Sequence, residues 1–114
     1  MEIEIKGQLN GQSLEIDAEG YLLDLTAWNV EIATFIAQTE NIVLTAEHWE
    51  IIYWLRDFYQ QFGLTPIMRV VIKEFAKQHG KDKGTSSHFM RLFSGTPLKV
   101  ATKIAGLPKP THCI

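Results

Sequence analysis

The chain has 114 residues, of which 46% are hydrophobic, and a formal net charge of -2. A chain of this size can bury a core sufficient for one domain without disulfides or a structural metal. No stretch approaches the ~20 apolar residues that cross a bilayer, and the start MEIEIKGQLNG lacks the basic and apolar segments of a secretory signal. We therefore expect a single domain over residues 1–114, located in the cytoplasm and without membrane contact.

Charge is distributed unevenly along the chain. Residues 1–66 carry two basic and eleven acidic side chains, whereas residues 67–114 carry nine basic and two acidic ones. Such a division either forms a basic face for an anionic partner or lets the two halves attract each other within the fold. The sequence leaves both possibilities open.

The predicted elements begin with a β-hairpin in the region 1–25. Apolar residues alternate on both sides of Asn10-Gly11, a dipeptide that favours the two-residue turn of a hairpin. A turn-rich stretch follows at 17–20, and residues 21–23 are expected to add a short third strand.

Helical periodicity occupies the region 30–105 and predicts about five helices. The clearest lies between Thr45, which can cap it, and Gly63, which can end it in a left-handed conformation, and we expect this helix to be central to the core. Thr65-Pro66 and Thr96-Pro97 each have the form of an N-cap followed by proline at the first helical position. The five helices are expected at 30–40, 45–62, 66–78, 86–93 and 97–105.

The residues after the last predicted helix form a C-terminal arm (residues 106–114). Gly106 is suited to stop the helix, and Pro108 and Pro110 prevent its resumption and favour an extended backbone. The fold class that follows is α+β: a small N-terminal β-hairpin packed on a mainly α-helical, helix-turn-helix-like region, followed by a flexible arm.

The arm carries Cys113, the one cysteine of the chain. A single cysteine is commonly a small buried apolar residue, but a position beside the terminus and behind two prolines favours an accessible thiol. Lys109 and His112 favour the thiolate, whereas the terminal carboxylate opposes it. The arm therefore predicts a reactive thiol at its tip.

Other chemistry has weaker support in the sequence. A zinc site from His112, Cys113 and a distant histidine lacks a rigid tetrahedral scaffold, and a Cys-His nucleophile lacks an orienting third group. No glycine-rich phosphate loop is present, so we expect no cofactor and no metal. The basic stretch from Lys73 to Arg91 leaves a helix-turn-helix nucleic-acid binder as an alternative, but the predicted helix at 86–93 is mostly apolar, so direct DNA binding is not expected.

Four segments together resemble the DsrC/TusE family over nearly the whole chain. They are LTAEHWEIIYWLRDFYQQFG at 44–63, TPIMRVVIKEF at 65–75, GKDKGTSSHFMRLF at 80–93 and KIAGLPKPTHCI at 103–114. The resemblance implies a sulfur-carrying cysteine at Cys113. Members with dissimilatory sulfite reductase roles have a second arm cysteine at the position that is Thr102 here, and a hydroxyl cannot close a disulfide.

The resemblance therefore implies the single-cysteine branch, whose members are sulfurtransferases that carry sulfur as a persulfide and have no independent turnover. The implied donor is a TusBCD-like complex, and the implied acceptor is a tRNA 2-thiouridylase with its tRNA. An accessory or regulatory gamma-type subunit of dissimilatory sulfite reductase is the alternative within the family. Residues expected to guide a partner or steady the persulfide are Lys109, Lys103, His112, Arg91 and Lys83.

Overall fold

In the computed structural model, which describes residues 3–9 and 12–110, the chain begins with two antiparallel strands, β1 (Ile3–Leu9) and β2 (Gln12–Asp17). Leu9 pairs with Gln12, as a two-residue connection requires; positions 10 and 11 lie outside the described residues. A bulge between Ile5 and Gln8 shifts the register next to a glycine, a residue that commonly marks such irregularities. The predicted hairpin is confirmed.

The predicted third strand is wrong, because residues 21–23 contribute only one isolated bridge, between Leu22 and Ile16. The Asp17 carboxylate accepts hydrogen bonds from the backbone N–H groups of Glu19 and Tyr21, both at 2.9 Å. Because the chain turns this tightly after β2, few of the following residues can pair with that strand. The chain then enters a short 3-10 helix, η1 (Leu25–Ala27), whose N-cap is Asp24. Hydrogen bonds from the Thr26 hydroxyl and backbone N–H lower the pKa of Asp24.

Five α-helices follow the hairpin, as predicted, and the α+β fold class is confirmed. Thr45 and Gly63 hold the positions that their local signals predict, with Gly63 at φ 69°. Thr85, which was not predicted, caps the helix at 86–93, and its hydroxyl accepts from the His88 N–H at 3.1 Å. The helices are α1 (Val30–Thr39), α2 (Ala46–Phe62), α3 (Met68–His79), α4 (Ser86–Phe93) and α5 (Pro97–Ile104).

The start of α3 differs from the prediction. The helix begins at Met68, and its N-cap is Ile67, whose backbone is extended with φ -79° and ψ 159°. Pro66 precedes the helix, and its side chain is buried. The helix therefore begins two residues after the proline that was expected to open it.

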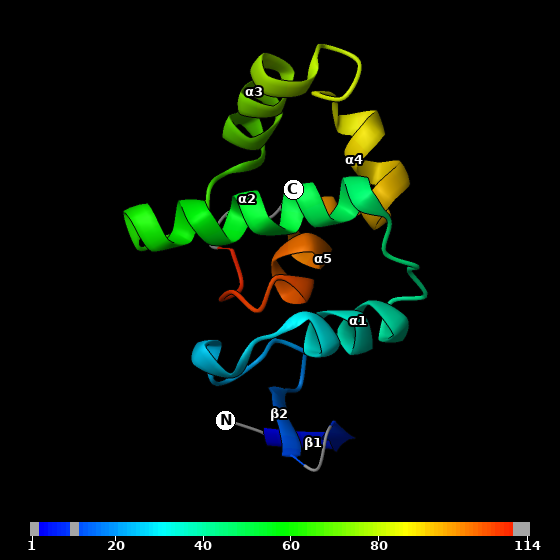
Figure 1. The fold of residues 1–114 in the computed structure, drawn as a ribbon, viewed down its shortest axis with the longest axis vertical. Helices are drawn as coiled ribbons and strands as arrows, with labels where there is room; N and C mark the ends of the chain where they lie inside the picture. The colour runs from blue at the N-terminus through cyan, green and yellow to red at the C-terminus, as the bar shows by residue number, and fades with distance from the viewer. Residues whose placement is uncertain (1–2, 10–11, 111–114) are drawn as a thin grey trace.

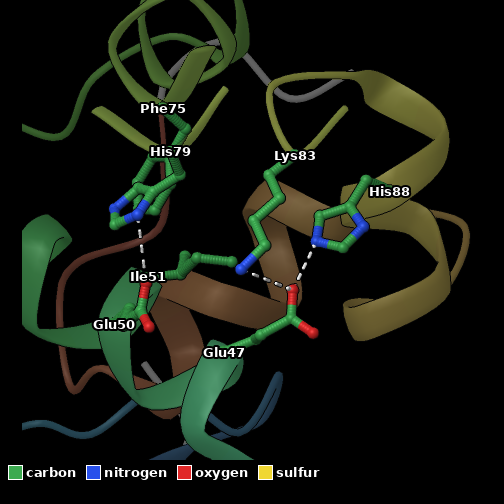
Figure 2. A pocket seen from close by; sticks show the side chains of 7 residues that line it. All are labelled: Glu47, Glu50, Ile51, Phe75, His79, Lys83 and His88. Carbon is green, nitrogen blue, oxygen red and sulfur yellow. Dashed lines mark hydrogen bonds and ion pairs between the residues drawn. The ribbon is translucent and has the colours of Figure 1, made fainter. Parts of the chain in front are cut away.

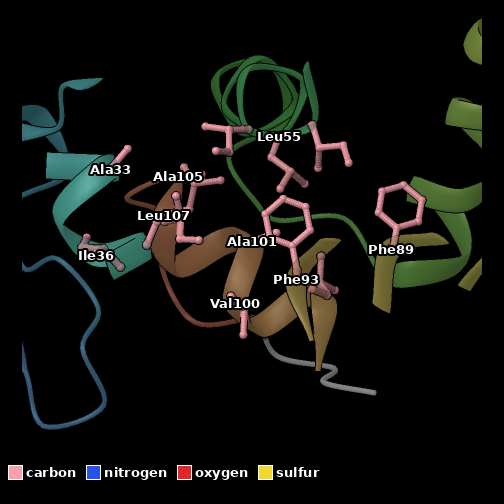
Figure 3. Close-up of a cluster of buried hydrophobic side chains, with 14 of the residues drawn as sticks. Ala33, Ile36, Leu55, Phe89, Phe93, Val100, Ala101, Ala105 and Leu107 are labelled. Carbon is pink, nitrogen blue, oxygen red and sulfur yellow. The ribbon is translucent and has the colours of Figure 1, made fainter. Parts of the chain in front are cut away.

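Helix α5, and not α2, is the central element of the fold. It contacts α1, α2 and α4, and Figure 1 shows it enclosed between α1 and α2. Leu98, Ala101 and Ile104 of α5 belong to the same buried cluster as Leu55 of α2 and Phe93 of α4. Figure 3 shows Ala101, Leu55 and Phe93 facing one another in this cluster. The C-terminal end of α2 is more exposed, and Phe62 there is 59% exposed.

Ion pairs join the acidic first half of the chain to the basic second half. Lys103 pairs with Glu40 at 2.7 Å, and Lys109 pairs with Glu19 at 2.9 Å. Lys83 also reaches a first-half carboxylate, that of Glu47, at 3.9 Å. The charge division of the sequence thus provides attraction within the fold. Among the helices that the structure describes, none is both long and apolar enough to span a membrane.

Candidate functional site

The end of α5 determines where the C-terminal arm begins. Gly106 adopts the left-handed conformation with φ 71°, and its N–H donates to the Lys103 carbonyl at 3.1 Å. The Leu107 N–H donates to the Thr102 carbonyl at 3.0 Å, which completes the hydrogen-bond pattern that commonly ends a helix at glycine. The predicted stop at Gly106 is confirmed.

Two side chains from the first half of the chain cap the last carbonyls of this helix. The Trp28 Nε1–H donates to the Ile104 carbonyl at 2.8 Å, and an Arg56 Nη1–H donates to the Ala105 carbonyl at 2.7 Å. The Arg56 guanidinium also lies over the Trp28 ring, 3.9 Å from its centroid. The last four carbonyls, which a helix leaves without intrahelical partners, therefore all accept a hydrogen bond.

Arg56 is a charged group in a half-buried position. Burial lowers the pKa of its guanidinium, whereas the nearby Tyr53 and Asp57 side chains raise it. Arginine remains protonated in proteins, so Arg56 presents a positive charge to the negative end of the α5 dipole. This interaction fixes α5 to α2 at the point where the arm begins.

The first residues of the arm, which we call the arm root (residues 106–110), are partly held on the domain. Leu107 is only 3% exposed and belongs to the same buried cluster as Ala33 and Ile36 of α1 (Figure 3). Pro110 is also buried, whereas Pro108 and Lys109 are exposed. The expected arm over 106–114 therefore departs from the domain no earlier than Pro110.

Thr102 lies in the core and not on the arm. Its side chain is fully buried on α5, and its hydroxyl donates to the carbonyls of Leu98 at 2.8 Å and Lys99 at 3.1 Å. These bonds to the preceding turn satisfy the hydroxyl within the helix. Position 102, at which the two-cysteine and single-cysteine proteins differ, is thus buried in the interior of this chain.

Of the lysines predicted to belong to the site, Lys109 is part of the arm root and Lys103 lies beside it, on the last turn of α5. Lys103 donates to Glu40, with only 16% of its side chain exposed, and its Nζ lies 5.4 Å from the centroid of the Tyr21 ring. Lys109 donates to both carboxylate oxygens of Glu19, at 2.9 and 3.1 Å. The loop that holds Glu19 and Tyr21 is therefore the neighbour of both.

The other predicted cations lie elsewhere. Lys83 extends toward Glu47 at the junction of α2, α3 and α4, where Figure 2 shows it beside a small pocket of about 10 Å³. His88 also bonds Glu47 there, at 2.8 Å. Arg91 is exposed on α4. The fold thus does not bring Lys83 or Arg91 to the arm root. The arm root lies on the other side of α2 from the α3–α4 turn (Figure 1).

Cys113 and His112 lie outside the described residues, so their predicted roles remain predictions. Within the described ranges 3–9 and 12–110, no three His, Cys, Asp or Glu side chains are grouped so that they could hold a metal ion.

A surface hollow beside the arm root was not predicted. It has a volume of about 150 Å³ and is open to solvent. The signal in the sequence was Arg56, one of only two basic residues in 1–66, but nothing local indicated that it would meet the end of α5. The hollow is lined by Leu25, Tyr53, Arg56, Asp57, Tyr59, Gln60 and Leu107.

Comparison with known proteins gives concordant results in sequence and in structure. The family model described as "DsrC like protein" matches residues 8–114. Sulfurtransferase TusE of Pectobacterium atrosepticum is 45% identical over 107 residues, which cover 94% of this chain and 98% of that protein. The sulfurtransferase TusE homolog of Haemophilus influenzae is 48% identical over 106 residues, which cover 93% of this chain and 97% of that protein.

The solved structure of Allochromatium vinosum DsrC superimposes with a TM-score of 0.88 and 39% sequence identity, covering 99% of this chain and 100% of that one. The oxidised gamma subunit of the dissimilatory sulfite reductase of Archaeoglobus fulgidus gives a TM-score of 0.80 and 36% identity, covering 98% of both chains. A family match over almost the entire length, together with relatives well above 30% identity, leads to one conclusion. The chain belongs to the DsrC-like protein family.

Proposed function

We propose that the protein is a sulfur carrier that accepts sulfane sulfur on Cys113 as a persulfide and passes it to a second protein. The observation that carries this proposal is the presence of a single cysteine, next to the carboxyl terminus, in a chain 45–48% identical to proteins named sulfurtransferase TusE. Related proteins of that identity over nearly their full length commonly share a reaction type.

The chemistry is an exchange between a thiolate and a persulfide. The Cys113 thiolate attacks the outer sulfur of a donor persulfide, a new S–S bond forms, and the donor S–S bond breaks. The donor cysteine leaves as a thiolate, and Cys113 holds the transferred sulfur as Cys–S–SH. No net oxidation occurs, so the step requires neither a redox cofactor nor a metal.

Thr102 favours the carrier over a two-cysteine redox role. With one cysteine in the sequence, no disulfide can form within the chain. The likeness to DsrC and to a sulfite reductase gamma subunit supports a second candidate, an accessory or regulatory subunit of that enzyme. That role depends on a stable complex with the reductase, which the carrier role does not require.

The proposed partners are a TusBCD-like persulfide donor and a tRNA 2-thiouridylase with its tRNA, and the proposed product is the 2-thio group of wobble uridine. The compartment is the cytoplasm, and the protein has no turnover by itself. Among the proposed helper residues, Lys109 and His112 are nearest in sequence to the persulfide. We assign partner contact to Lys103, Lys83 and Arg91. Lys103 is already paired with Glu40, and Lys83 is already paired with Glu47.

The nucleic-acid-binding alternative has less support. Phe89 and Phe93 of α4 are buried, so this helix serves the core, and Arg91 is its one basic residue apart from His88. The alternative predicts salt-dependent DNA or RNA binding that survives Cys113→Ser. The carrier proposal expects no such binding by the isolated protein.

Intact-mass analysis tests the proposal after incubation with a cysteine desulfurase, cysteine and the donor complex. We expect a mass gain of one sulfur atom that is reversed by a thiol reductant. Cys113→Ser should abolish the gain, whereas Thr111→Ser, a matched change on the same arm, should retain it. A wild-type protein that gains no sulfur from a donor of proven competence would refute the proposal.

A further inference from the structure

The packing of the arm root limits how far Cys113 can extend from the domain. Pro110 is buried, and Cys113 is three residues further along the chain. At about 3.3 to 3.6 Å per residue, the thiol-bearing residue lies no more than about 11 Å from Pro110 as long as the arm root stays packed. A protein that reaches this thiol must therefore come close to the surface of the domain.

A hollow adjoins the arm root at Leu107, which forms part of its wall. Tyr53 is 46% exposed, although its ring stacks on Trp49 at 5.8 Å and meets the edge of Trp28 at 6.1 Å between centroids. An exposed aromatic ring held in one orientation loses little conformational entropy when a partner covers it.

The charges of the hollow favour an uncharged protein side chain over nucleic acid. Among the described residues that line the hollow, Arg56 is the one cation, and its guanidinium already bonds the Ala105 carbonyl and lies over Trp28. Asp57 adds a carboxylate that repels phosphate. Tyrosine, tryptophan and arginine are also the residues that most often dominate protein–protein interfaces.

We propose that this hollow is the docking surface for the protein that donates sulfur to Cys113, and that it receives an aromatic or aliphatic side chain of that protein. The inference rests on the proposed carrier function and adds a binding surface to it. Docking here would hold the donor persulfide within the short reach of the arm.

Two neighbouring glutamines of α2 provide the test. Both are exposed, but only Gln60 lines the hollow, whereas Gln61 does not. Gln60→Trp and Gln60→Arg fill the hollow with a bulky side chain, and Gln61→Trp and Gln61→Arg are the matched controls. The measurement is the rate of sulfur loading at increasing concentrations of the purified persulfide-bearing donor complex, with alkylation of Cys113 by iodoacetamide in parallel.

We expect both Gln60 variants to raise the half-saturating donor concentration by about tenfold or more, as central interface residues do. Both Gln61 variants should remain within about twofold of wild type, and alkylation should be equal in all proteins. Wild-type loading in the Gln60 variants would overturn the docking proposal while leaving the carrier function intact, whereas absent loading in wild type would refute the carrier function itself.

Two other outcomes would also overturn the docking proposal. Tighter tRNA binding by Gln60→Arg would identify the hollow as a nucleic-acid surface. Slower alkylation in the Gln60 variants would show that the substitutions act on the thiol and not on docking.

Discussion

At the scale of single residues, Thr102 illustrates how one position separates two kinds of chemistry. The sequence shows only that it is not a cysteine, and the structure adds that its hydroxyl is buried and bonded to Leu98 and Lys99. A thiol at this position would be enclosed by the core. In this fold, a second cysteine on α5 would need the helix to open before it could react.

A thiol introduced at position 102 tests this burial. In the double variant Thr102→Cys/Cys113→Ser, we expect no alkylation of the native protein and one adduct after denaturation, because buried thiols are inert. Ser87→Cys/Cys113→Ser, whose changed residue is exposed on α4, should react rapidly in the native state. Native alkylation of position 102 within about tenfold of the rate at position 87 would contradict the burial.

The burial of Thr102 was not predicted. Lys103 follows it directly, Lys99 lies three residues before it, and threonine is ordinarily a surface residue. Leu98 and Ala105 nevertheless share its face of the helix, and the contacts of α5 with three other helices bury that face.

At the scale of elements, the end of α5 is the feature that links the fold to the proposed function. A Cβ added to Gly106 would clash with Trp28 Cδ1, so the glycine is required both for its backbone conformation and for the approach of the indole. The same indole donates to Ile104. Helix termination, the Trp28 contact and the direction of the arm are therefore coupled.

Gly106→Ala should destabilise the protein more than the same change at a similar helix end. Gly63 has nearly the same φ, 69°, but has nothing within 4 Å of an added Cβ. We expect Gly63→Ala to lower the free energy of unfolding by about 1 kcal/mol, the cost of a left-handed alanine. Gly106→Ala should cost about 3 kcal/mol, because displacement of Trp28 adds to that strain.

Urea denaturation followed by circular dichroism measures both changes. Equal losses in the two variants would show that Trp28 does not pack against Gly106 as described.

Helix ends were also the part of each element that the sequence predicted best. Thr45, Gly63 and Gly106 act on backbone groups within a few residues of themselves, and each occupies the predicted position. The local signal at Thr65-Pro66 was misleading: the proline is buried outside the helix, which begins at Met68.

At the scale of the whole molecule, the two oppositely charged halves are held together by ion pairs of unequal exposure. Lys103 and Glu40 join α5 to the end of α1, with 16% and 27% of their side chains exposed. Lys109 and Glu19 join the arm root to the loop after β2 and are 44% and 49% exposed. Solvent screens the second pair more strongly than the first.

Double-mutant cycles should reveal this difference. With Lys103→Met and Glu40→Gln, we expect a coupling free energy of about 1 kcal/mol, whereas Lys109→Met and Glu19→Gln should give less than about 0.5 kcal/mol. Thermal or urea unfolding of the single and double variants provides both values. A larger coupling for the exposed pair would contradict this ranking.

The sequence by itself determined the hairpin, the helices, the stop at Gly106 and the presence of one thiol near the end of the chain, because each depends on residue type or on groups a few positions apart. Only the tertiary structure decided that α5 is the central helix, that Leu107 and Pro110 hold the arm root and that Arg56 borders a hollow beside it. These features depend on contacts such as Trp28 with Ile104 and Arg56 with Ala105. Such residues are far apart in the chain, so their meeting is fixed by packing of the whole core and not by any local signal.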